Sequence, residues 1–64
     1  METEIRYYLN GKHIDGWDEP EGEWPVNIEA AAQNLTDYEP GDVFRAEQLD
    51  GYEHVLDSIE STLD

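Results

Sequence analysis

Cysteine, positive charge and long apolar runs are all scarce in this 64-residue sequence. The absence of cysteine excludes disulfide bonds and cysteine-based metal sites, and it agrees with a cytoplasmic protein. Every apolar run is far shorter than the ~20 residues that a membrane-spanning helix needs, so we expect no membrane segment. A chain of this length forms one domain, residues 1–64, with a small core of limited stability.

Basic residues are so few that negative charge dominates the sequence. Seventeen Asp and Glu face three basic residues, Arg6, Lys12 and Arg45, which gives a net charge of −14. Such a chain repels the phosphates of nucleic acids and of anionic membranes, so we expect it to bind neither directly. Seven aromatic residues and two periodic segments nevertheless predict a folded chain rather than a disordered acidic tail.

The segment Glu4–Gly16 predicts a β-hairpin. Apolar and polar residues alternate over residues 5–9, which is the period of a strand. Asn10-Gly11 fits a two-residue type I′ turn, because both central residues of that turn need positive φ. A turn there fixes these cross-strand pairs: Leu9 with Lys12, Tyr8 with His13, Tyr7 with Ile14, and Arg6 with Asp15.

Residues 16–42 predict a loop, a short helix and a turn. The loop 16–25 is rich in proline, glycine and acids. We expect one or both of Trp17 and Trp24 to close the core; the alternative is an exposed anchor for a partner. Asn27 is a good N-cap for a helix that ends at Leu35. Pro40-Gly41 fits the centre of a type II turn.

The C-terminal stretch Leu49–Asp64 predicts an amphipathic helix. Its apolar residues recur at steps of three and four: Leu49, Tyr52, Leu56, Ile59 and Leu63. Carboxylates recur one residue later: Asp50, Glu53, Asp57, Glu60 and Asp64. This spacing gives one buried side and, beside it, a column of negative charge.

The expected fold class is therefore α+β, a small single domain. An N-terminal antiparallel β-hairpin packs against two helices, of which the C-terminal one is amphipathic and acidic. Residues Val43–Glu47 fit a possible third strand, or the last helix begins as early as Arg45. Gly51 favours a later start near Asp50, since glycine inside a helix costs about 1 kcal/mol relative to alanine.

The sequence contains no pattern that indicates catalysis or metal binding. It has no nucleophile elbow, no phosphate-binding glycine loop, and no HExxH or EF-hand spacing. The two histidines fit structural positions, His13 stacked on Tyr8 and His54 on the polar face of the last helix. A chain this short rarely forms a pocket that shields a catalytic carboxylate from water. We expect no enzyme activity, no cofactor and no metal site.

The acidic residues are the remaining candidates for a binding surface. On a helix, like charges three or four residues apart each cost a few tenths of a kcal/mol, so an unrelieved column indicates function rather than stability. A loop beside it adds a second row: Asp15, Asp18, Glu19, Glu21 and Glu23. Two such rows imitate a polyphosphate backbone. Alternatives are a solvated face, or a halophilic or housekeeping domain that is merely acidic.

In size, acidity and lack of catalytic motifs, the whole chain resembles the small acidic inhibitors that bacteriophages encode, many of which mimic DNA. It is similar to anti-CRISPR proteins that act on type I surveillance complexes (Cascade). The resemblance implies that the carboxylates of both rows occupy a basic groove meant for target DNA, in the cytoplasm of a bacterial host. Inhibitors of restriction enzymes or of uracil-DNA glycosylase are alternatives within this group.

Overall fold

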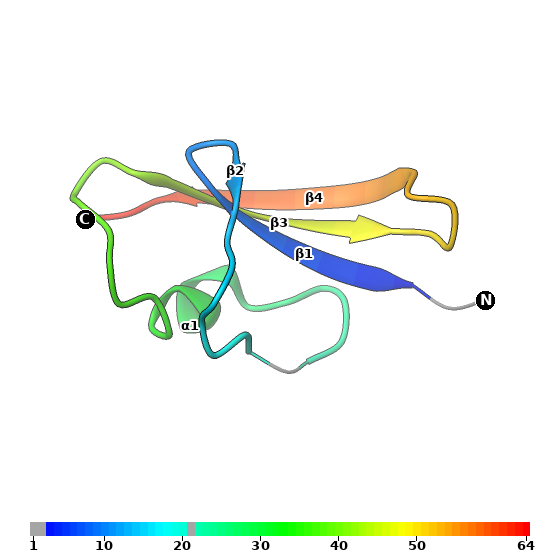
Figure 1. Ribbon diagram of the computed structural model, residues 1–64, viewed down its shortest axis with the longest axis horizontal. Helices are drawn as coiled ribbons and strands as arrows, with labels where there is room; N and C mark the ends of the chain where they lie inside the picture. Colours follow the sequence, from blue (N-terminus) through cyan, green and yellow to red (C-terminus); the bar gives the residue numbers. More distant parts are fainter. Residues whose placement is uncertain (1–2, 21) are drawn as a thin grey trace.

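Four antiparallel strands form a sheet in the order β2-β1-β3-β4, with one short helix on one of its faces (Figure 1). This computed structural model describes residues 3–20 and 22–64. The elements are β1 (Glu4–Leu9), β2 (Lys12–His13), α1 (Ile28–Ala32), β3 (Val43–Leu49) and β4 (Val55–Thr62). Residues 15–42, here called the connecting layer, carry α1, run along the helix-side face of the sheet and return to β3 past one end of it; the opposite face is called the open face.

The predicted N-terminal hairpin is confirmed, together with its turn and register. Asn10 and Gly11 have φ angles of 51° and 81°, as a type I′ turn requires. Tyr8 lies opposite His13 and Leu9 opposite Lys12. The expected pair of Arg6 with Asp15 is wrong, because β2 ends at His13.

The predicted C-terminal helix is wrong, since residues 49–64 form the end of β3, a turn and β4. Asp50-Gly51 opens that turn, and Asp50 accepts hydrogen bonds from the backbone N–H groups of Tyr52 and His54. Ile59 and Leu63 lie four residues apart, so they share a face in a helix and also in a strand. In the structure Leu63 is buried, and Ile59, which pairs with Ala46, is partly buried. A strand also separates like charges that a helix would stack.

The expected α+β arrangement of a hairpin packed against two helices is therefore also wrong. Residues 43–49 form the central strand β3, which pairs with β1 and β4, so the third-strand alternative is correct. The single helix α1 has five residues. Its predicted N-cap is confirmed: the Asn27 side chain accepts a hydrogen bond from the backbone N–H of Ala30 at 3.1 Å.

Aromatic residues form the centre of the core on the helix-side face. Phe44 is fully buried and stacks on Tyr7, with 5.6 Å between the ring centroids. Trp17 meets both rings edge to face, at 5.3 Å from Tyr7 and 6.0 Å from Phe44. Trp24 and Ala31 also join this cluster, which confirms the core role expected of the two tryptophans.

Two of the five residues expected in the apolar side of the last helix are instead exposed. Tyr52 is 82% exposed and Leu56 is 50% exposed. Tyr52 lies in the β3–β4 turn, and Leu56 has no counterpart on β3, because Gln48 pairs with Asp57 and Leu49 with Val55. Leu56 is thus the extra residue of a β-bulge.

A substitution in the first turn tests the hairpin. We expect Gly11→Val to lower the free energy of unfolding by about 1–2 kcal/mol, because a β-branched residue resists positive φ. Chemical denaturation measures the loss. Gly51→Val is the matched control, since both glycines have open space around Cβ but only Gly11 has positive φ. Equal losses in the two variants would contradict the turn assignment.

Candidate functional site

The five carboxylates predicted for the last helix do not form a column. Asp50 and Glu53 lie at the β3–β4 turn, and Asp64 follows β4. Asp57 lies opposite Gln48 on the helix-side face, whereas Glu60 lies opposite Arg45 on the open face. The predicted single acidic stripe is therefore wrong, and its supposed repulsive cost is no longer evidence for function.

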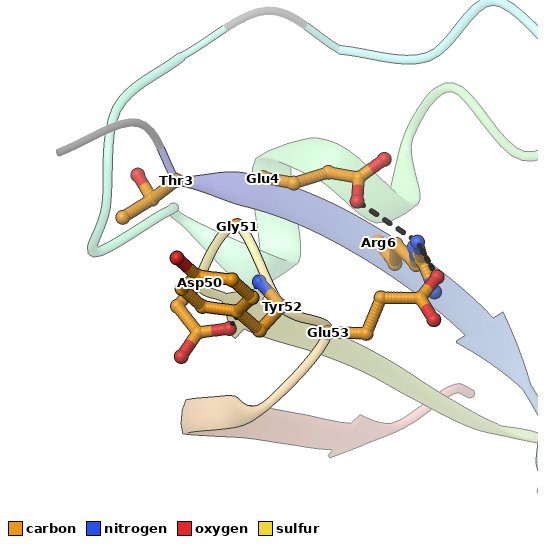
Figure 2. A pocket seen from close by; sticks show the side chains of 7 residues that line it. All are labelled: Thr3, Glu4, Arg6, Asp50, Gly51, Tyr52 and Glu53. Atoms are coloured by element: carbon orange, nitrogen blue, oxygen red, sulfur yellow. Dashed lines mark hydrogen bonds and ion pairs between the residues drawn. The ribbon is translucent and has the colours of Figure 1, made fainter.

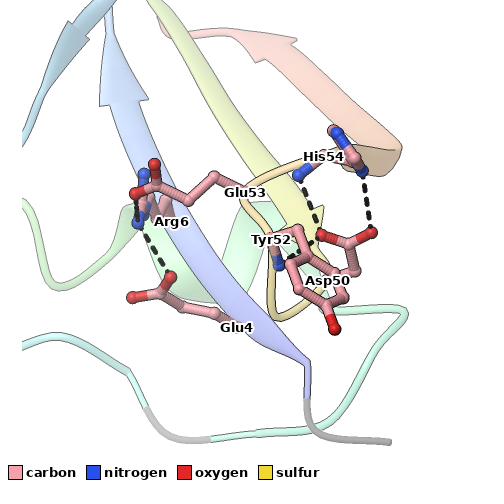
Figure 3. Close-up of polar contacts among 6 residues, drawn as sticks. All are labelled: Glu4, Arg6, Asp50, Tyr52, Glu53 and His54. Carbon is pink, nitrogen blue, oxygen red and sulfur yellow. Dashed lines mark hydrogen bonds and ion pairs between the residues drawn. The ribbon is translucent and has the colours of Figure 1, made fainter.

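Asp50 has a structural role in the turn. Its carboxylate accepts hydrogen bonds from the backbone N–H of Tyr52 at 2.7 Å and of His54 at 2.9 Å (Figure 3). The Nδ1 atom of His54 lies 3.2 Å from the other carboxylate oxygen. These contacts, the backbone hydrogen bond from His54 first, lower the pKa of Asp50. Most of its hydrogen-bonding capacity is used within the turn.

Glu53 is paired with a cation of this same chain. Arg6 donates to Glu4 at 2.9 Å and to Glu53 at 3.0 Å, and these bonds raise the pKa of the guanidinium (Figures 2 and 3). A shallow hollow surrounds this pair, lined by Thr3, Glu4, Arg6, Asp50, Gly51, Tyr52 and Glu53. Because the one cation of this lining already has two carboxylate partners, the hollow offers little charge to a ligand.

The open face of the sheet is mixed in charge. The Arg45 guanidinium lies 5.1 Å from the centroid of the Tyr8 ring, and its Nε atom is 3.2 Å from Glu47. The His13 ring meets Tyr8 edge to face, as expected of a strand residue stacked on it. This face therefore combines cations, carboxylates and an aromatic ring, and it has no single sign of charge.

The connecting layer, in contrast, is acidic throughout. Residues 15–42 contain nine Asp and Glu and neither lysine nor arginine. The predicted loop residues Asp15, Asp18, Glu19 and Glu23 are exposed here, whereas Glu21 lies outside the described residues. Asp15 is 3.3 Å from His13. Among the described residues, the structure pairs none of the other layer acids with a cation.

Sequence reasoning missed part of this surface. Glu29 on α1 and Asp37 and Glu39 after it are exposed as well. Asp42 is partly buried; it accepts hydrogen bonds from the backbone N–H of Glu39 and from Asn10, which lower its pKa. The signal was present in the sequence, because no cation occurs between Lys12 and Arg45.

One of the β4 carboxylates does join the layer. The indole Nε1 of Trp24 donates a hydrogen bond to Asp57 at 3.0 Å. This bond ties the edge strand to the acidic loop and adds Asp57 to the charges on the helix-side face. Glu60 remains on the other face, so the structure brings together only part of the two predicted rows.

Two further findings concern only the part of the chain that the structure describes. Within residues 3–20 and 22–64, no group of three His, Asp or Glu side chains is placed to hold a metal ion. None of the helices described there is long and apolar enough to cross a membrane.

The lowered pKa values of Asp42 and Asp50 predict that the free energy of unfolding decreases at acidic pH; this part of the pH dependence is called the acid limb. A carboxylate whose folded pKa lies below its unfolded value of about 3.9 stabilises the fold at higher pH. That contribution is lost as the pH falls through the folded pKa. We therefore expect the free energy of unfolding to drop below about pH 4, and Asp50→Asn to show a shallower drop.

Chemical denaturation at a series of pH values measures this limb. Asp18→Asn is the control, because it removes the same charge without touching a turn hydrogen bond. An acid limb in Asp50→Asn as steep as that of the unmodified chain would contradict the assigned role of Asp50.

Comparison of the chain with protein-family models, with curated protein sequences and with solved structures gives no significant match.

Proposed function

We propose that this protein is an inhibitor that binds the basic, DNA-accepting groove of a nucleic-acid-binding complex through its connecting layer. One observation carries the proposal: the segregation of charge. All three cations lie on strands of the sheet, Arg6 on β1, Lys12 on β2 and Arg45 on β3. The layer over the helix-side face has only acids among its charged residues, so it presents one sign of charge to a partner.

The charge density supports imitation of a nucleic acid. A net charge of −14 along a long axis of 36 Å is roughly one charge per 2.6 Å, against about one per 1.7 Å for duplex DNA. The chain is therefore sparser than a duplex by less than a factor of two. A groove that neutralises phosphates with lysine and arginine would attract such a surface by the same long-range forces.

The target class follows from the resemblance to anti-CRISPR proteins. We propose a type I surveillance complex, with the layer occupying the groove that receives target DNA, in the cytoplasm of a bacterial host. The inhibitor has no catalytic step in this proposal and acts by occupancy. Opposite charge would mainly raise its association rate, and shape and hydrogen bonds would then set how long it stays.

A competition assay tests the proposal. Purified type I complex is mixed with labelled target duplex, and this protein is added before or after the DNA. We expect inhibition of DNA binding when the protein is added first, and weaker inhibition at higher salt. Replacement of Glu23 and Glu29 by lysine should slow association about tenfold at low salt, while the fold persists because both side chains are exposed.

The matched control is Glu60→Lys with Asp64→Lys, which changes the net charge equally but outside the layer. This pair should inhibit far better than the layer variant. Equal loss in both variants would assign binding to total charge rather than to the layer. If DNA and this protein bind the complex at the same time, the protein does not occupy the DNA-accepting groove. That result would overturn the proposed DNA mimicry and favour the alternative of a merely acidic domain.

A further inference from the structure

β4 is an edge strand along its whole length. It pairs with β3 on one side only. The backbone N–H of Leu63 donates to the carbonyl oxygen of Asp42 at 2.8 Å. Because hydrogen bonding alternates along an antiparallel strand, this bond implies that the backbone N–H and C=O groups of residues 57, 59 and 61 point toward β3. The N–H and C=O groups of Ser58, Glu60 and Thr62 therefore point away from the sheet.

The other edge of the sheet is too short to compare. β2 has two residues, whereas β4 has eight. Ordinary strands pair over about five or six residues, so β4 alone offers an edge of the length that strand addition needs.

The edge is protected against a second copy of this chain. The bulge at Leu56 interrupts regular pairing at one end. In the middle, one oxygen of Asp57 accepts a hydrogen bond from the backbone N–H of Ser58 at 2.9 Å. β4 contains Asp57 and Glu60 and no cation, so two copies would bring like charges together across a new ladder.

We propose that the free edge of β4 docks an extended segment of a partner protein that carries lysine or arginine, which joins the sheet as a fifth strand. Carboxylates lie on both faces of the edge, with Asp57 on the helix side and Glu60 on the open side. A strand with basic side chains therefore finds opposite charge on whichever face they occupy. Beyond the bulge, Tyr52, Val55 and Leu56 are 82%, 53% and 50% exposed, and they offer contacts to an apolar residue at one end of the segment.

This inference goes beyond the proposed function, because it needs no nucleic-acid groove. Main-chain hydrogen bonds supply affinity in strand addition, and side chains on alternate faces supply specificity. The two surfaces are distinct: the acidic layer runs along the helix-side face, and the edge of β4 runs along the side of the sheet (Figure 1).

A synthetic peptide tests the edge directly. The probe is a peptide of about eight residues that alternates lysine and valine, matched to the length of a strand. With the full chain labelled for NMR, we expect the peptide to slow amide hydrogen exchange of Glu60 and Thr62 about tenfold. The amide of His13, on the short opposite edge, should not change.

The first control is the same peptide with all of its backbone nitrogens methylated, which keeps the charge but leaves no N–H donor for the ladder in either register. It should bind about tenfold more weakly, since each lost hydrogen bond weakens binding several-fold. If both peptides bind equally well, charge attraction alone accounts for binding, and the proposal of strand addition would be overturned. Slow exchange of Glu60 and Thr62 in a dimer without peptide would also overturn it, because the edge would then belong to a second copy.

Charge-reversal variants locate the site. Glu60→Lys should weaken binding of the basic peptide much more than Glu29→Lys, although both change the net charge equally. Glu29 lies in the connecting layer, so Glu29→Lys should compete with DNA more weakly while it binds the peptide as before. That combination separates the two proposals. Equal weakening by both variants would overturn the placement at β4.

Discussion

The contact between Tyr7 and Phe44 is the interaction on which the rest of the structure depends. It joins β1 to β3, and Trp17 packs edge-on against both rings. Through Trp17 it also holds an acidic segment against the sheet. Each buried aromatic side chain stabilises the fold by roughly 1.5–3 kcal/mol, whereas an exposed charge pair contributes less than about 1 kcal/mol. A few aromatic contacts can therefore offset the mutual repulsion of the layer.

Local signals were readable from the sequence, and long-range pairing was not. The Asn10-Gly11 turn, the Asn27 cap and the Pro40-Gly41 turn each depend on a few adjacent residues. The structure has all three, with Gly41 at a φ of 96° and a hydrogen bond from the N–H of Asp42 to the carbonyl of Glu39. The C-terminal stretch fits two periods at once, and only its pairing with β3 decides between them. The β3–β4 turn spans residues 50–54 and has its positive φ at Glu53, so it lacks the two-residue Asn-Gly type of signal that identified the first hairpin.

The acidic loop residues of the candidate site were predicted correctly, whereas the acids of β4 were not, because their grouping depended on the wrong secondary structure. The loop acids were identified from composition, and exposed carboxylates on a loop keep that property in almost any fold. The acids of β4 were grouped by helical spacing, so a change of secondary structure divided them between two faces. A different sequence signal identifies Glu29, Asp37 and Glu39: the long stretch between Lys12 and Arg45 that contains no lysine or arginine.

The residues that hold the fold and the residues that carry the charge are largely separate sets. Tyr7, Phe44 and Ala46 are buried in β1 and β3, while the described acids of the connecting layer, with the exception of Asp42, are exposed on loops and one short helix. Surface substitutions away from packing and caps usually change stability by less than about 0.5 kcal/mol. The layer can therefore accumulate substitutions without loss of the sheet beneath it. In evolutionary terms, this division lets the surface follow a changing partner while the scaffold stays constant.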